Sequence, residues 1–259
     1  MSTPCRILLF ALALMLMPVM ASAQTSLVIV TNIYPPYVNE DVKNSFLPAL
    51  FDEIGKEMGV RFDIRILPWK RCEQSVEDLD AWGAIPYTPT ENRHKVFLFS
   101  EPIYVADSQF FAYRDPQTSP FSRPPLTYTD IGDLKRWRIG GIQGYYYEPI
   151  FAAAGINVDY ALSERQNFER LKLGRIDLFP AATTVGWHLI KQLFPPEIVE
   201  NFYTLEKPLI ADATLHLMTA KDYPDNYALL ERFNRALKDI QQNGTFAELV
   251  DQYGLVMRY

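Results

Sequence analysis

The segment 27–67 reads LVIVTNIYPPYVNEDVKNSFLPALFDEIGKEMGVRFDIRIL and contains a strand, a helix and a second strand in that order. Its β-branched start at 27–31 predicts a buried strand, and the two prolines that follow predict a loop, because proline cannot donate to a sheet ladder. Apolar residues at a spacing of 3.6 predict a helix that Ser45 caps, that runs to Met58 and that Gly59 ends. The alternation over 61–67 predicts a half-buried strand.

The rest of the chain repeats this alternation of strands and helices. A short helix near 70–78 leads to a strand at 80–85, and a loop rich in Pro, Ser and Thr is expected at 115–128. The later segments are predicted to be strand 138–142, helix 145–154, a helix that carries Phe168 and Leu171 and ends at Gly174, strand 176–179, a helix from Thr184, strand 213–218, helix 226–242, and a last short helix opened by a capping box at 245–248. This order is typical of two α/β units with mostly parallel sheets, and the final strand and helices have no obvious place in the second unit.

The composition is that of an ordered globular protein. Of its 259 residues, 48% are hydrophobic and 22% are charged, so the chain can bury a substantial core in one large domain or two smaller ones. The formal net charge is −6. This charge argues against binding to a nucleic acid, because the phosphate backbone requires a basic face.

Residues 1–23 have the pattern of a secretory signal peptide. Arg6 supplies the positive charge, an apolar run covers 7–20, and Ala21-Ser22-Ala23 provides a cleavage site before Gln24. The alternative is a membrane anchor, but the 14 residues of 7–20 are too few to cross a hydrocarbon core of about 30 Å. The mature chain, 24–259, is therefore expected to be soluble and exported.

Cysteine and histidine usage predicts neither a disulfide nor a bound metal. Cys5 lies in the signal peptide, so Cys72 has no partner and is expected to be a small buried residue. The three histidines, His94, His188 and His216, are far apart and lack the spacing of metal ligands. The glycine-rich run 140–144 does not fit the dinucleotide-binding fingerprint, so we expect no cofactor.

Two polar segments are candidates for binding an anion. The first is Thr88-Pro89-Thr90-Glu91-Asn92-Arg93, which follows a predicted buried strand. A guanidinium matches a carboxylate with two parallel hydrogen bonds, and nearby hydroxyls can donate to the same oxygens. The alternative for Arg93 is a solvated surface charge. The second is Gln143-Gly144-Tyr145, where free amide groups at a helix start can attract an anion. The alternative is an ordinary turn capped by water.

Aromatic residues form a third group of candidates. They are Tyr34, Tyr37, Trp69 and the run 145–147. Such side chains provide rigid apolar walls with a polar tip. Each of them is alternatively a core residue. Tyr34 and Tyr37 flank the prolines of the first loop, which favours their exposure.

Six short motifs follow one another along the chain. They are Tyr34-x-Pro36-Tyr37, Thr90-x-x-Arg93 with Phe99-Ser100-x-Pro102, Asp133-Leu134-Lys135, Gln143-Gly144, Gly174-Arg175-Ile176-Asp177 and Asn243-Gly244-Thr245. Behind a signal peptide, this series resembles the family 3 periplasmic solute-binding proteins over the whole mature chain. Members of that family are the receptor components of polar amino-acid ABC importers.

The resemblance implies a two-lobed, type II periplasmic-binding-protein fold. Each lobe has a mixed, mostly parallel sheet flanked by helices, and two hinge strands join the lobes. Lobe 1 is expected at 24–104 plus 212–259, and lobe 2 at 105–211. The last strand and helices then return to lobe 1, and the ligand lies in the cleft between the lobes.

The resemblance also implies roles for the candidate residues. Arg93 would hold the ligand carboxylate with help from Thr88, and the amide groups at Gly144 and Tyr145 would bind it from lobe 2. The walls of the pocket would be Tyr34, Tyr37 and Trp69. Arg71, close to Trp69 in the sequence, is either a second anion contact or a surface charge.

The chain departs from the family pattern where an Asp usually holds the ligand ammonium. Five residues after Asp177 stands Ala182, followed by the uncharged Thr183 and Thr184. Pro86 also replaces a usual glycine, which removes a backbone donor. Burying an ammonium without a carboxylate costs several kcal/mol. Either another acid holds the ammonium, or the ligand has none.

We therefore expect a monomeric periplasmic receptor, without enzymatic activity, for a small carboxylate-bearing solute such as an amino acid or a related compound. It would deliver this solute to the permease of an ABC importer. A second hypothesis is an exported, dehydratase-like enzyme on the same scaffold, with Glu91, Asp212 and His216 as the nearest acid and base candidates. A third is a ligand-loaded partner of a membrane sensor.

Overall fold

The computed structural model describes residues 25–116 and 126–259. The expected signal peptide at 1–23 lies outside these residues, as does most of the loop expected at 115–128. In the part of the chain that is described, no helix is both long and apolar enough to cross a membrane.

The first lobe is built on three parallel strands. β1 (Ser26–Thr31) lies between β2 (Arg61–Ile66) and β3 (Gly83–Tyr87). The helices that connect them are α2 (Phe46–Met58) and α3 (Trp69–Glu77). This lobe therefore has the strand–helix–strand order that the sequence pattern predicts.

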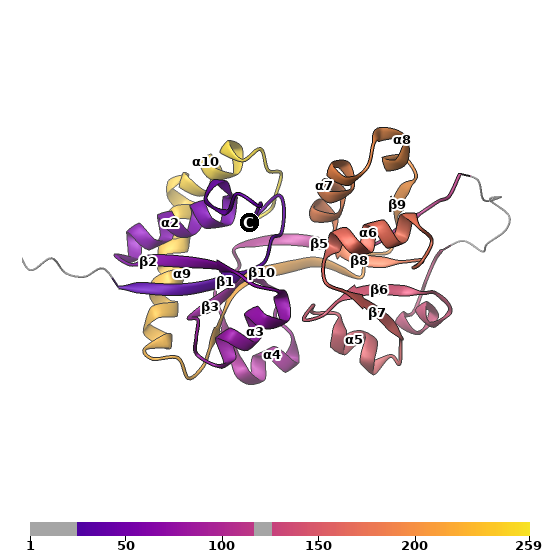
Figure 1. Cartoon of the computed structure of the whole chain (residues 1–259). Helices are drawn as coiled ribbons and strands as arrows, with labels where there is room; N and C mark the ends of the chain where they lie inside the picture. Colours follow the sequence, from indigo (N-terminus) through magenta and orange to yellow (C-terminus); the bar gives the residue numbers. More distant parts are fainter. Residues whose placement is uncertain (1–24, 117–125) are drawn as a thin grey trace, which may run out of the picture.

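Two long antiparallel strands, β5 (Tyr104–Tyr113) and β10 (Ile210–Ala220), connect the two lobes (Figure 1). β10 pairs with β3 and with the short β4 (Phe97–Phe99) in the first lobe. β5 pairs with β8 (Phe179–Ala182) and β9 (Phe202–Thr204) in the second lobe. The sheet order is β2-β1-β3-β10-β5-β8, so one mixed sheet continues from one lobe into the other.

The second lobe adds a parallel pair of strands, β6 (Ile139–Ile142) and β7 (Val158–Ala161). A bridge between Ile139 and Leu178 brings β6 beside the segment that leads into β8. The helical segments of this lobe are η3 (Ile131–Arg136), α5 (Glu148–Ala153), α6 (Glu164–Lys172), α7 (Thr183–Leu193) and α8 (Pro196–Val199). In Figure 1, α7 and α8 lie on one side of these strands and α5 on the other.

The last two helices, α9 (Asn226–Asn243) and α10 (Thr245–Gln252), return to the first lobe (Figure 1). Both pack against α2. The ring centroids of Phe51 and Phe233 are 5.4 Å apart, and those of Phe46 and Phe246 are 5.6 Å apart. The final strand and helices thus complete the core of the first lobe.

A buried polar network holds the start of α9. The Trp82 indole N–H donates to Asn226 Oδ1 at 2.9 Å. Asn226 Nδ2 in turn donates to the Thr219 hydroxyl at 3.0 Å and to the Ala220 carbonyl at 2.7 Å. Because its amide group is paired on both sides, the buried Asn226 can tie α9 to β10 and to the residue before β3 at little cost in desolvation.

Helix ends agree with the sequence at α2 and differ at α10. Gly59 ends α2 in the left-handed conformation, at φ +65°. Ser45 precedes α2 as predicted, but its side chain makes no capping bond to the helix. The capping box expected at Thr245 is not formed, because Gly244, at φ +94°, is the residue that precedes α10.

Two elements of the second lobe begin later than predicted. The helix expected at 145–154 starts at Glu148. Gly144 has a left-handed backbone, and the Tyr147 hydroxyl accepts a hydrogen bond from the Ile142 amide. Together these two features hold the intervening residues in turns. The strand expected at 176–179 lies at Phe179–Ala182, where the residues pair with β5.

Candidate functional site

A cavity of about 50 Å³ lies between the lobes, beside the two connecting strands. The residues that line it come from both lobes: Tyr34, Trp69, Pro86, Tyr87, Thr88, Arg93, Ala106, Asp107, Ser108, Gly144, Tyr145, Tyr146, Ala182, Ala213 and Leu215. A single water needs a cavity of about 10–15 Å³. A solute as large as an amino acid therefore requires side chains or lobes to move from this arrangement.

Six of the eight predicted site residues line this cavity together: Tyr34, Trp69, Thr88, Arg93, Gly144 and Tyr145. They come from the loop after β1, the start of α3, the loop after β3, the short helix α4 (Glu91–Val96) and the turn after β6. The fold thus brings together residues that are far apart in the sequence.

The other two predicted residues do not line the cavity. Tyr37 is buried behind Tyr34, with ring centroids 5.9 Å apart, and also packs on Tyr104 at 4.7 Å. It supports the wall from behind. Arg71 is exposed, because it lies two positions after the buried Trp69 on α3 and such positions point to nearly opposite sides of a helix.

Arg93 is positioned by the short helix α4 (Glu91–Val96). As N-cap, Thr90 accepts a hydrogen bond from the Arg93 amide at 3.2 Å. The Arg93 residue is only 8% exposed, and its guanidinium carbon lies 4.6 Å from the centre of the Tyr87 ring, which is a cation–π contact. Arg93 is therefore not a solvated surface charge.

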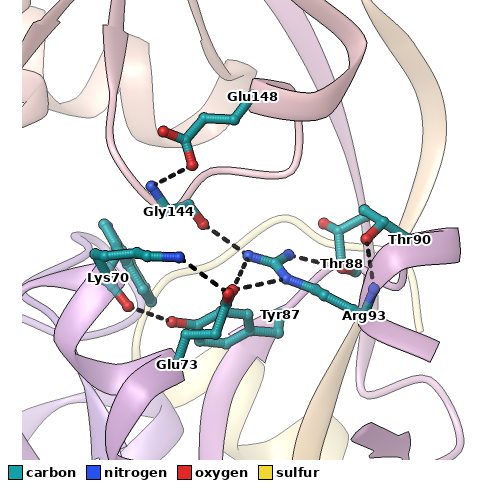
Figure 2. A network of polar contacts seen from close by, with 9 residues as sticks. Lys70, Glu73, Tyr87, Thr88, Thr90, Arg93, Gly144 and Glu148 are labelled. Carbon is teal, nitrogen blue, oxygen red and sulfur yellow. Dashed lines mark hydrogen bonds and ion pairs between the residues drawn. The ribbon is translucent and has the colours of Figure 1, made fainter. Parts of the chain in front are cut away.

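Figure 2 shows that the Arg93 guanidinium binds groups of both lobes. Nη1 donates to the Thr88 carbonyl at 2.9 Å, and Nη2 donates across the cleft to the Gly144 carbonyl at 2.6 Å. Nε and Nη2 also donate to Oε2 of Glu73, at 3.1 and 3.0 Å. The sequence analysis missed Glu73, because nothing in its local pattern shows that α3 packs beside α4.

Gly144 brings the backbone of the second lobe close to the start of α3 in the first. Its φ is +84°, and a Cβ atom there would lie 2.8 Å from the Lys70 amide nitrogen. The Gly144 amide donates to Glu148 Oε2 at 2.9 Å, and the Tyr145 amide donates to the Ile142 carbonyl at 3.4 Å. Both amide groups predicted to bind an anion are thus used within the second lobe, and Tyr145 presents its ring to the cavity.

Aromatic rings from both lobes form a continuous wall of the cavity. Trp69 lies at its centre, with ring centroids 5.4 Å from Tyr34, 5.7 Å from Tyr87 and 5.9 Å from Tyr145. All three contacts are edge-on, a geometry that aromatic pairs prefer. The wall joins the two lobes, because Tyr145 belongs to the second and the other three rings to the first.

Glu164 lies behind this wall and was not predicted. It is the first residue of α6, is 5% exposed and accepts a hydrogen bond from the Tyr145 hydroxyl. Burial raises the pKa of its carboxyl group, and this hydrogen bond opposes the rise. In the sequence, a Glu directly after Ser163 indicates only a helix start. Its burial arises from the packing of α6 against the rest of the protein.

Ala182 brings no carboxylate to the cavity, and its partner across β5 and β8, Ser108, brings a hydroxyl. Ala106, Ala213 and Leu215 line the cavity with them. Among the described residues that line the cavity, Asp107 is the one acid, and its carboxylate is engaged elsewhere. It lies 3.3 Å from the Arg258 guanidinium and accepts a hydrogen bond from the Asp212 amide at 2.9 Å.

The acid and base candidates of an enzyme do not meet in this cavity. Glu91 is exposed on α4, Asp212 pairs with Arg258, and neither lines the cavity. His216 is buried, with Nδ1 2.6 Å from the Ser100 carbonyl oxygen, and burial lowers the pKa of its ring. Within residues 25–116 and 126–259, no three His, Cys, Asp or Glu side chains are grouped so that they could hold a metal ion.

Residues 27–256 match a protein family, the bacterial extracellular solute-binding proteins, family 3. The chain belongs to this family. The match includes both lobes and the two connecting strands. The family description supports solute binding outside the cytoplasm as the role of the protein.

Relatives of this solute-binding protein are distant but span most of its length. The lysine/arginine/ornithine-binding periplasmic protein of Escherichia coli (strain K12) is 22% identical over 249 residues, which covers 85% of this chain and 84% of that protein. An arginine-binding periplasmic protein of Mannheimia haemolytica is 25% identical over 241 residues, which covers 91% of this chain and 93% of that protein. Both relatives are named as binding proteins.

A solved structure of a histidine kinase sensor domain with similarity to periplasmic binding proteins has the same fold. Its TM-score to this solute-binding protein is 0.76 at 17% identity, and the match covers 91% of this chain and 98% of that domain. The fold is therefore the two-lobed fold of periplasmic binding proteins.

Proposed function

We propose that this protein captures a small carboxylate-bearing solute between its lobes and delivers it to an ABC importer. The observation that carries the proposal is the position of Arg93, a buried cation at the cavity that contacts the Thr88 carbonyl in one lobe and the Gly144 carbonyl in the other. A guanidinium binds a carboxylate through paired charge-assisted hydrogen bonds.

The proposed lobes are residues 24–104 plus 212–259 and residues 105–211. Strands β5 and β10 lie at both boundaries and serve as the hinge. Because the cavity is lined by groups of both lobes, a solute that contacts both favours the closed arrangement over an open one. Arg93 and Trp69 belong to the first lobe, and Gly144 and Tyr145 to the second.

The solute class follows from the lining and from the relatives. Arg93 provides the positive charge, while Tyr34, Trp69 and Tyr145 provide flat apolar surfaces for the body of the solute. Two relatives are named for arginine, one of them also for lysine and ornithine. Because Ala182 has no carboxylate, the site favours solutes that do not place an ammonium there.

The test is a thermal-shift panel at millimolar concentration that varies one group of the solute at a time. L-arginine carries both charged α-groups, 5-guanidinopentanoate lacks the α-amine, and agmatine lacks the carboxylate. L-lysine, L-ornithine and their amine-free acids extend the panel. A solute at about 100 times its dissociation constant stabilises the folded state by about 2.7 kcal/mol. We expect carboxylates to stabilise the protein and agmatine to have no effect.

Two variants connect the result to the site. Arg93→Ala should weaken binding of the best carboxylate by about 2–5 kcal/mol, the range for removing one partner of a buried charge pair. Arg71→Ala, which removes an exposed arginine nearby, should leave binding unchanged. Unchanged affinity in Arg93→Ala, or stabilisation by agmatine equal to that by L-arginine, would refute the proposal.

A receptor releases its solute unchanged. The bound carboxylate should be recovered intact after long incubation with the protein, whereas an enzyme would convert it.

Uptake of the labelled solute should fall in cells that lack this protein and return with the wild-type gene. A normal uptake rate in cells without the protein would argue instead that the protein, with its solute bound, is the partner of a membrane sensor.

A further inference from the structure

Arg93 already holds a carboxylate of the protein itself. Four of its five N–H groups have acceptors. The Nε–H and one N–H of Nη2 donate to Oε2 of Glu73. The second N–H of Nη2 donates to the Gly144 carbonyl, and one N–H of Nη1 donates to the Thr88 carbonyl. Only one N–H of Nη1 has no acceptor among the described residues. A solute carboxylate that uses two donors of Arg93 must therefore replace one of these acceptors.

Glu73 is the acceptor that can leave most easily. The Thr88 carbonyl belongs to the backbone of the same lobe as Arg93, and the Gly144 carbonyl leaves only when the second lobe moves away, so both stay in place while the lobes are closed. The Glu73 side chain is 19% exposed, and its remaining partner is Lys70, whose Nζ lies 3.4 Å from Oε1. The Lys70 side chain is 59% exposed, so Glu73 can turn towards solvent and keep this ion pair.

We infer that Glu73 occupies the place of the solute carboxylate on Arg93 and gives it up when a solute binds. This inference rests on the proposed function and names a determinant of specificity at the same site. Exchange of one carboxylate for another leaves the number of charge-assisted hydrogen bonds unchanged, so a bare carboxylate gains little. A solute gains affinity only through its other contacts.

The consequence is discrimination against simple anions. Acetate and similar small acids have no body to place against Trp69 and Tyr145, and they do not displace Glu73. A larger carboxylate packs against this aromatic wall and does displace it. Glu73 thus prevents abundant small acids from occupying the receptor.

The test compares Glu73→Gln with wild type, using sodium acetate as the probe in calorimetric titrations of the mature protein. An amide is a weaker partner for Arg93 than a carboxylate. If Glu73 is on Arg93 in about 90% of the molecules or more, its removal raises the apparent affinity about tenfold or more. We therefore expect Glu73→Gln to bind acetate at least about tenfold more tightly than wild type.

Controls separate this effect from general changes of charge and from misfolding. Glu77→Gln removes an exposed carboxylate one turn further along α3 and should leave acetate binding as in wild type. The gain should disappear in the double variant Glu73→Gln/Arg93→Ala. Circular dichroism melts of all variants should show cooperative unfolding like that of wild type.

Acetate binding by Glu73→Gln that equals or falls below that of wild type overturns the inference, and so does the absence of acetate binding in both. Ethylammonium tests the opposite role, in which Glu73 binds a solute cation. Binding of ethylammonium to wild type that is lost in Glu73→Gln also overturns the inference. The proposed function fails separately, when Arg93→Ala leaves binding of the panel carboxylates unchanged.

Discussion

Replacing Gly144 by alanine tests whether close contact between the lobes is needed for binding. The added Cβ atom would lie 2.8 Å from the Lys70 amide nitrogen and 3.0 Å from its Cα. Both atoms belong to the backbone at the start of α3 and cannot turn away as a side chain does. The turn that carries Gly144 must therefore move away from the first lobe.

The size of the effect follows from two contributions. Alanine at a left-handed φ costs about 1 kcal/mol, whether the lobes are together or apart. Movement of the turn also weakens the bond from Arg93 Nη2 to the Gly144 carbonyl, now 2.6 Å long. A hydrogen bond to a charged group contributes about 1.5–3 kcal/mol. We therefore expect the closed arrangement to lose about 2 kcal/mol, or about a thirtyfold rise in the dissociation constant.

A matched control is available in Gly174. Its φ is +61°, and a Cβ atom added there would meet no other atom within 4 Å. Gly174→Ala therefore has the same backbone cost without the clash between lobes. We would measure the dissociation constant of the best carboxylate of the panel by calorimetry, and the free energy of unfolding by urea titration, for both variants.

Both variants should lose about 1 kcal/mol of stability from the left-handed φ, and only Gly144→Ala should lose affinity. Separation of the lobes can also be measured between spin labels on cysteines introduced at the exposed Glu77 and Lys172. The distance should increase in Gly144→Ala alone. Equal dissociation constants and equal distances in the two variants would show that this contact does not support binding.

Three further predictions concern stability and reactivity. Because burial raises the pKa of Glu164, the folded state binds more protons than the unfolded chain. Protonation of Glu164 therefore stabilises the folded state below the ordinary pKa of 4.5, and this stabilisation is lost as the pH rises through the pKa of the folded state. Glu164→Gln, which lacks this carboxyl group, should therefore lose less free energy of unfolding than wild type between pH 4.5 and pH 7. Urea titrations in which the two proteins show the same pH dependence would contradict this. Cys72 is fully buried, and burial raises its pKa to about 12, so it should not react with an aromatic disulfide reagent at pH 8 until the protein unfolds; rapid reaction of the folded protein would disprove it. Asn226→Ala should cost about 2–4 kcal/mol, because it leaves the buried Trp82 indole N–H and the Thr219 hydroxyl unpaired. A loss below about 1 kcal/mol in urea titrations would mean that these groups find other partners.

Local sequence patterns predicted much of the first lobe. The apolar spacing of 46–58 and the glycine after it determine α2 with little help from the rest of the chain, because helix periodicity and a left-handed end are local properties. The short strands β4, β7 and β9 were not predicted. Strands of three or four residues form because a partner strand offers hydrogen bonds, and that partner is not visible in the local sequence.

The candidate site was predicted in part for the same reason. The turn at Gly144 and the motif ending at Arg93 have local signatures, and both line the cavity. The expectation that the Tyr145 amide faces a ligand did not anticipate that the turn uses this group itself, at 3.4 Å from the Ile142 carbonyl. Arg71 was a candidate because it is close to Trp69 in sequence, but helix geometry directs it to the outside.

The sequence by itself determined the α/β alternation, the family, and six residues that line one cavity. These features depend on spacing and residue type over short distances, which a single chain displays directly. Only the tertiary structure decided which groups meet at the Arg93 guanidinium. Glu73 and Gly144 lie 20 and 51 residues from Arg93 in sequence, yet both bind its guanidinium. Such contacts arise when separate elements pack against each other, so the charge balance of the site, and with it the expected selectivity, belongs to the folded protein.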